Sequence, residues 1–98
     1  MIIEAAILNI KENEEMQFEK SFHKAKSIIS SMKGFISLQL NRCIEHKSRY
    51  LLLVKWHTID DHENGFRKSA EYIEWKNLLH HYYSPFPIVE HFENIIDI

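Results

Sequence analysis

Histidines and aromatic side chains gather in the second half of this 98-residue chain, where they could do acid–base chemistry on a small aromatic molecule. His62 precedes Phe66 by four residues, so on a helix the two side chains would share a face. Histidine suits a general base because its ordinary pKa lies close to neutrality. We therefore predict His62 as the first candidate base. The alternative is an exposed histidine at a helix start, whose removal would hardly change stability.

His91 is the second candidate base. Alternation along the last predicted strand, residues 88–96, places His91 on the face of Val89, opposite Glu90 and Phe92. The alternative is a hydrogen-bonded structural histidine within a sheet, which is the more common role.

The remaining histidines and the single cysteine do not predict a metal site or a nucleophile. His80 and His81 are adjacent near a helix end, where they would diverge and where one can interact with the helix dipole. A zinc site needs three or four convergent ligands, and no HEXXH-type motif is present. Cys43 has no base beside it in the sequence, and a lone cysteine fits a reducing compartment.

Several aromatic and basic side chains could bind the substrate. A cavity is predicted between the second helix and the sheet, and its walls would be aromatic: Phe66, Tyr72, Trp75 and Tyr83. Aromatic residues at helical spacing are more often core residues, and that alternative stays open. Arg67 or Arg42 could hold an anionic substrate, although a solvated arginine or an ion pair is the usual role for each.

Four strands and two helices must position these side chains. Residues 2–10, 35–44, 49–56 and 88–96 have the β-branched or alternating patterns of strands, and the short loop after residue 44 indicates a hairpin. Pro85 and Pro87 fix the turn into the last strand, with Phe86 expected to close that end of the fold.

The first helix is predicted between Asn13 as its N-cap and Gly34 as its C-cap. Its apolar residues recur every three or four positions and would face the core. The second helix should occupy about residues 60–80, with a capping box begun by Asp60. It should be kinked or divided, because Gly65 weakens it and Ser69 can cap it again.

The resulting order βαββαβ predicts an α+β, ferredoxin-like fold, with two helices on one face of an antiparallel sheet. Residues 49–56 are apolar on both faces, since Leu51 and Leu53 point opposite to Leu52 and Val54. A chain of this size cannot leave a large apolar sheet face in water. We therefore predict a homodimer with its sheets packed face to face.

Composition excludes several other classes of protein. The net charge of −2 gives no basic excess for nucleic acid or an anionic membrane. No apolar run reaches membrane-spanning length, and the N-terminal residues lack the basic segment of a signal peptide. These observations predict one domain over residues 1–98 and a cytoplasmic location.

Three stretches resemble the antibiotic biosynthesis monooxygenase (ABM) domain family of the dimeric α+β barrel superfamily. They are RYLLLVKW, D-D-H-x-x-G-F-R-x-S-x-x-Y-x-x-W-K and H-x-Y-x-P-F-P-x-V-E-H, and the resemblance covers nearly the whole chain. It implies a monooxygenase that uses no metal, flavin or other cofactor. Such an enzyme binds an electron-rich, often phenolic molecule between the helices and the sheet, and the deprotonated substrate transfers an electron to O2.

Other functions on the same fold remain as alternatives. They are a binding or sensing module that holds a small aromatic molecule, and a lyase or isomerase that uses the same histidine base. Haem-degrading members of the family carry asparagine, tryptophan and histidine where this chain has Ala6, Phe66 and Lys76. Asn9 would lie on the opposite strand face from Ala6. The resemblance therefore does not favour haem degradation.

Overall fold

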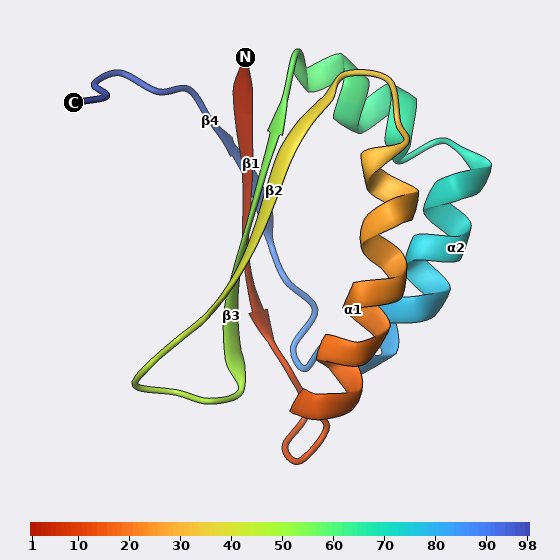
Figure 1. The fold of residues 1–98 in the computed structure, drawn as a ribbon, viewed down its shortest axis with the longest axis vertical. Coiled ribbons are helices and arrows are strands. Elements are labelled where there is room, and N and C mark those ends of the chain that lie inside the picture. Colours follow the sequence, from red (N-terminus) through yellow and green to blue (C-terminus); the bar gives the residue numbers. More distant parts are fainter.

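A four-stranded antiparallel sheet, covered by helices on one side only, forms the framework of the protein (Figure 1). The computed structural model describes residues 1–98. Its strands are β1 (Ile2–Asn9), β2 (Phe35–Arg42), β3 (Arg49–Trp56) and β4 (Val89–Phe92), arranged in the order β2-β3-β1-β4. This is the predicted ferredoxin-like arrangement, and the predicted α+β class is confirmed.

The register of the sheet sets which side chains meet at its centre. In β1, Glu4 lies opposite Val54 of β3 on one side and opposite His91 of β4 on the other. Glu4 and His91 are therefore neighbours across one strand pair, although they lie at opposite ends of the chain.

Helix α1 (Glu15–Ser30) covers the sheet with its apolar side. Its buried side chains recur at three- and four-residue spacing, as predicted: Phe18, Phe22, Ala25 and Ile29. The helix ends at Ser30, so Gly34 lies beyond it and is not its immediate C-cap. Gly34 has φ +86°, and its carbonyl accepts a hydrogen bond from the His57 N–H. Glycine is needed there for the turn into β2.

The predicted division of the second helical segment is confirmed. A short π-helical turn, η1 (Asp61–Phe66), precedes α2 (Ala70–Leu79), and the 3-10 turn η2 (His80–Tyr82) follows it. Ser69 begins the second part, since its hydroxyl accepts a 3.1 Å hydrogen bond from the Tyr72 backbone N–H.

The side-chain capping hydrogen bonds predicted at the two other helix starts are not formed, although Asp60 does occupy the N-cap position of η1. Asn13 adopts φ +69° in a turn before α1, and Glu14 occupies the N-cap position without a side-chain hydrogen bond. At η1, Asp60 makes no cap bond, and Thr58 Oγ1 instead accepts the backbone N–H of Asp61 at 3.1 Å. Asparagine tolerates the left-handed backbone conformation better than most residues. Asn13 therefore stabilises the turn before α1 and does not cap the helix.

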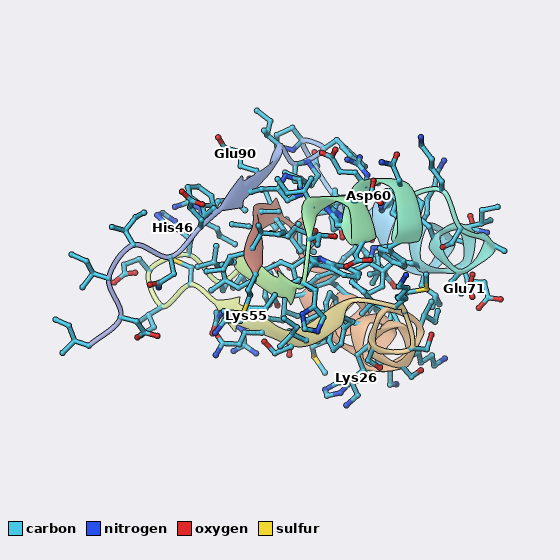
Figure 2. All side chains as sticks on the ribbon, turned by 90° about the horizontal axis from the view of Figure 1, so that it is seen from above. Lys26, His46, Lys55, Asp60, Glu71 and Glu90 are labelled. Atoms are coloured by element: carbon cyan, nitrogen blue, oxygen red, sulfur yellow. The ribbon has the colours of Figure 1, made fainter.

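The other face of the sheet carries no helix. In Figure 2 the labelled Lys26 and Glu71 mark the helical layer, whereas Lys55 and Glu90 belong to strands at the other side of the molecule. Strand β4 ends at Phe92, earlier than predicted, and the chain beyond it leaves the sheet (Figure 1). Neither α1 nor α2 has the length and apolar character needed to cross a membrane.

Candidate active site

A small cavity lies between the second helical segment and the sheet, where the sequence predicts one. Its volume is about 40 Å³. The five residues predicted to bind substrate all line it: Phe66, Arg67, Tyr72, Trp75 and Tyr83. Phe66 packs edge-on against Tyr72 and Trp75, with ring centroids 5.2 and 5.7 Å apart, so the aromatic wall is continuous. Their roles in binding stay predictions.

His62 projects from η1 toward the cavity and is 3% exposed. Its ring stacks on the Trp56 indole, with centroids 5.5 Å apart and an interplanar angle of 24°. The alternative of an exposed histidine is therefore wrong, and we expect removal of the buried ring to lower stability. The sequence predicts that a helix starts near His62. It does not predict the π-helical turn, which directs the His62 side chain inward.

His91 is held against His62 by a direct hydrogen bond. His62 Nδ1 and His91 Nε2 are 2.8 Å apart. His91 is half-buried on the same strand face as Val89, as alternation predicts, while Phe92 lies on the bare face. On its outer side, His91 Nδ1 lies 3.9 Å from Glu63 Oε1. The two histidines predicted as alternative bases are thus joined in one pair.

Glu4 lies in the site, although it is not among the residues predicted from the sequence. It is 6% exposed, lines the cavity, and accepts a 2.9 Å hydrogen bond from Trp56 Nε1. The same Oε1 atom lies 3.3 Å from His62 Nε2. The sequence does contain a pattern that could have indicated Glu4, because strand alternation places it on the inward face with Ala6 and Leu8.

Burial moves the pKa values of the two groups in opposite directions. It raises the pKa of Glu4 to about 7, against the opposing effects of the Trp56 hydrogen bond and the Arg67 charge. It lowers the pKa of His62 to about 4, and the charges of His91 and Arg67 act in the same direction. At neutral pH, His62 is therefore an uncharged imidazole beside a carboxyl group that populates both of its protonation states.

His80 also lines the cavity, which the sequence did not predict. It packs edge-on against Phe86, with centroids 4.9 Å apart. Burial, with the charges of Lys76 and Arg67, lowers the pKa of His80 to about 4. Burial also raises the pKa of the Tyr83 phenol well above its usual range. Both side chains can therefore offer hydrogen bonds without carrying charge at neutral pH.

Several other candidates lie elsewhere. Arg42 makes an ion pair with Glu19 at 2.8 Å, and neither side chain lines the cavity. Asn9 lines a hollow on the bare face. Burial alternates along β1, so Asn9 and the buried Ala6 lie on opposite faces, as predicted. Phe86 is 59% exposed and does not close the end of the fold. No three histidine, cysteine, aspartate or glutamate side chains are grouped so as to hold a metal ion.

The positions compared with haem-degrading enzymes have different surroundings. Ala6 and Phe66 are buried and line the cavity, whereas Lys76 is exposed on α2. None of these three side chains is a usual haem-iron ligand in proteins.

Comparisons with known proteins agree with the fold. The family model for antibiotic biosynthesis monooxygenases matches residues 1–78. The uncharacterized protein YczJ of Bacillus subtilis is 55% identical over 95 residues, which are 97% of this chain and 100% of YczJ. A solved Bordetella bronchiseptica protein whose description carries the same family name is 32% identical over 97% of both chains, with a TM-score of 0.93.

SnoaB, a cofactor-independent oxygenase from Streptomyces nogalater, shares the fold at a TM-score of 0.79. It is 14% identical, and the match covers 99% of this chain and 95% of SnoaB.

Proposed function

The chain belongs to the antibiotic biosynthesis monooxygenase family, and from that premise we propose that it oxidises a small aromatic or quinol-like molecule with O2, without a cofactor. One observation carries the proposal. An uncharged, buried imidazole and a carboxyl group with a pKa near neutrality stand 3.3 Å apart in the wall of an aromatic cavity. Such a pair can exchange a proton with a phenol that apolar rings shield from water.

The reaction begins when the substrate hydroxyl loses its proton to the acid–base groups, with the pair His62 and His91 moving that proton. The electron-rich anion then gives one electron to O2, and the two radicals combine to a peroxide. Protonation of the peroxide and loss of water leave one oxygen atom in the product. The substrate supplies all four electrons that reduce O2: one oxygen atom takes two of them and leaves as water with two protons from the substrate, and the other takes two and stays bonded to carbon in the product.

The cavity residues support distinct parts of this reaction. Phe66 and Trp75 offer faces against which an aromatic ring can pack. Tyr72 and Tyr83 carry hydroxyl donors for the substrate oxygens, and Arg67 brings positive charge to the rim, where it favours the anionic form.

Substrate entry requires a side chain to move. A cavity of about 40 Å³ holds little more than one water molecule, so a substrate ring cannot enter it unchanged. Phe86 lines both this cavity and the hollow on the bare face, and it is 59% exposed. We propose that rotation of the Phe86 ring opens the cavity.

Oxygen consumption by the metal-free protein with a panel of hydroquinones and anthrone-like compounds tests the function. With an accepted substrate, His62→Gln should lower turnover by roughly a hundredfold or more. His46→Gln, in the exposed loop between β2 and β3 (Figure 2), is the matched control and should keep wild-type turnover. Binding of these compounds without oxygen uptake would instead indicate a binding module, and a product without added oxygen would indicate a lyase or isomerase.

We propose further that the protein is a homodimer formed through the bare sheet face. That face has a hollow of about 470 Å³, lined by 11 residues of which 7 are hydrophobic. Ile7, Phe92 and Ile88 leave 47%, 52% and 81% of their surfaces exposed there. A second copy offers a surface of the same apolar character. Light scattering at micromolar concentration tests this, and a monomer mass would refute it.

A further inference from the structure

Glu4 is the carboxyl group of the acid–base pair, and its position decides which member of the pair takes the proton first. Its Oε1 atom has two nitrogen neighbours, Trp56 Nε1 at 2.9 Å and His62 Nε2 at 3.3 Å. A carboxyl group in the middle of a strand and under a helical layer is costly to bury. Its place in the wall of the cavity makes it accessible to a ligand there.

A line of polar atoms continues from Glu4 to the surface. After the 3.3 Å step to His62 Nε2, His62 Nδ1 shares a 2.8 Å hydrogen bond with His91 Nε2. His91 Nδ1 then lies 3.9 Å from Glu63 Oε1, and the Glu63 side chain is 50% exposed. An imidazole can accept a proton at one nitrogen while it releases one at the other, so both histidines can pass protons along this line.

We propose that Glu4 takes the proton from the ligand and that His62, His91 and Glu63 conduct it to solvent, an inference that rests on the proposed function. The ligand hydroxyl first transfers its proton to the Glu4 carboxylate. Glu4 passes it to His62 Nε2 while the proton on His62 Nδ1 moves to His91 Nε2. His91 releases its Nδ1 proton to Glu63 or to water. One proton enters the line, one leaves it, and no electron moves. Both rings are left with their proton on Nε2, the tautomer that ionised Glu4 holds, and each returns to the Nδ1 tautomer by proton exchange before the next proton enters.

The surroundings of Glu4 fit this assignment. Titratable or charged groups face it from the sheet and from the helical layer: His62, Arg67, Tyr72, His80, Tyr83 and His91. Among them, burial keeps His62 and His80 uncharged at neutral pH, and Arg67 carries the fixed positive charge. Burial raises the pKa of Glu4 to about 7, while the Trp56 hydrogen bond and the Arg67 charge act against it, so Glu4 can both accept and donate a proton near pH 7.

The tautomer of His62 offers a test that needs no substrate. Protonated Glu4 donates to His62 Nε2, which places the ring proton on Nδ1, whereas ionised Glu4 accepts from an Nε2 proton. Nitrogen-15 NMR of the ring should therefore show a change of tautomer with a midpoint equal to that of the Glu4 carbon-13 titration. In Glu4→Gln the change should be absent, because the amide oxygen that accepts from Trp56 also accepts from His62 at every pH and keeps the ring proton on Nε2. A single His62 tautomer throughout the wild-type titration would overturn the proposal.

Turnover supplies the second test where a substrate is accepted. Glu4→Gln, which can still accept from Trp56, should lower turnover by roughly a hundredfold or more. His91→Ala should lower it less and should recover when imidazole is added to the buffer. Glu71→Gln, on the exposed side of α2, is the matched control and should behave as wild type.

Wild-type turnover in Glu4→Gln would refute the role of Glu4. If no compound supports oxygen consumption, the proposed function fails, and the tautomer measurement still decides whether the proton path exists.

Discussion

The two faces of the sheet differ in where they place polar and apolar groups. The helix-covered face contains Glu4 and His62, which are 6% and 3% exposed, among buried aromatic residues. The bare face is mainly apolar, and Ile7 and Phe92 are about half exposed on it. Ionisable groups are thus buried where chemistry can use them, and apolar groups are exposed where a second copy can cover them.

Two adjacent leucines on β3 provide the largest test of this difference. Leu52 is 4% exposed under the helices, whereas Leu51 lines the hollow on the bare face. Leu52→Asp should destabilise the fold by more than roughly 4 kcal/mol, because it buries an unpaired carboxyl group. Leu51→Asp should leave the fold intact and abolish dimer formation. Circular dichroism and light scattering measure the two outcomes, and equal effects of the two changes would contradict the assignment of the faces.

The pH dependence of stability tests the buried pair. The pKa of Glu4 is raised to about 7 in the folded state. Its contribution to the free energy of unfolding is therefore complete below its ordinary pKa near 4.5 and is lost as pH rises to 7. The shift corresponds to roughly 3 kcal/mol. The pKa of His62 is lowered to about 4 in the folded state. Its contribution to the free energy of unfolding is therefore present above pH 6.5 and is lost as pH falls toward 4.

The two contributions offset each other in the wild type between about pH 4.5 and 6.5. In Glu4→Gln, urea unfolding should show stability rising with pH across this window, and in His62→Gln it should show stability falling. Parallel profiles for the two variants would contradict the opposite directions of the two pKa shifts.

Removing the His62 ring is expected to have the next largest effect on stability. His62→Ala leaves a cavity beside Trp56 and removes the nitrogen partner of His91, at a cost of roughly 2 kcal/mol. The matched control is His57→Ala at an exposed position, which should change the free energy of unfolding by less than roughly 0.5 kcal/mol. Similar values for the two variants in urea unfolding would show that the His62 ring is not packed.

The smallest effect is expected at the rim of the helix-covered face. Arg42 pairs with Glu19 at 2.8 Å, and 57% of its side-chain surface is exposed. Arg42→Gln should change stability by less than roughly 1 kcal/mol and should leave turnover unchanged, because the ion pair is solvated and remote from the cavity. A large loss of turnover would restore Arg42 as a substrate anchor.

Much of this framework follows from local patterns. Alternation in residues 49–56 correctly predicts a strand with two apolar faces, and the spacing of Gly65 and Ser69 correctly predicts a divided second helix. The concentration of aromatic residues after Tyr50, together with the family resemblance, predicts the aromatic lining of the cavity. The caps were less predictable, because Asn13 and Asp60 can satisfy neighbouring groups in several local conformations.

The sequence by itself determined the order of the elements and which side chains of each strand point inward or outward. It also determined that the face of the sheet without helices carries apolar side chains. Only the tertiary structure decided that Glu4, His62 and His91 form one line. His62 and His91 are 29 residues apart in sequence, and they meet because β4 pairs with β1 while the π-helical turn directs His62 onto Trp56. Such contacts depend on strand register and on burial, and burial also sets the pKa values that make the group reactive.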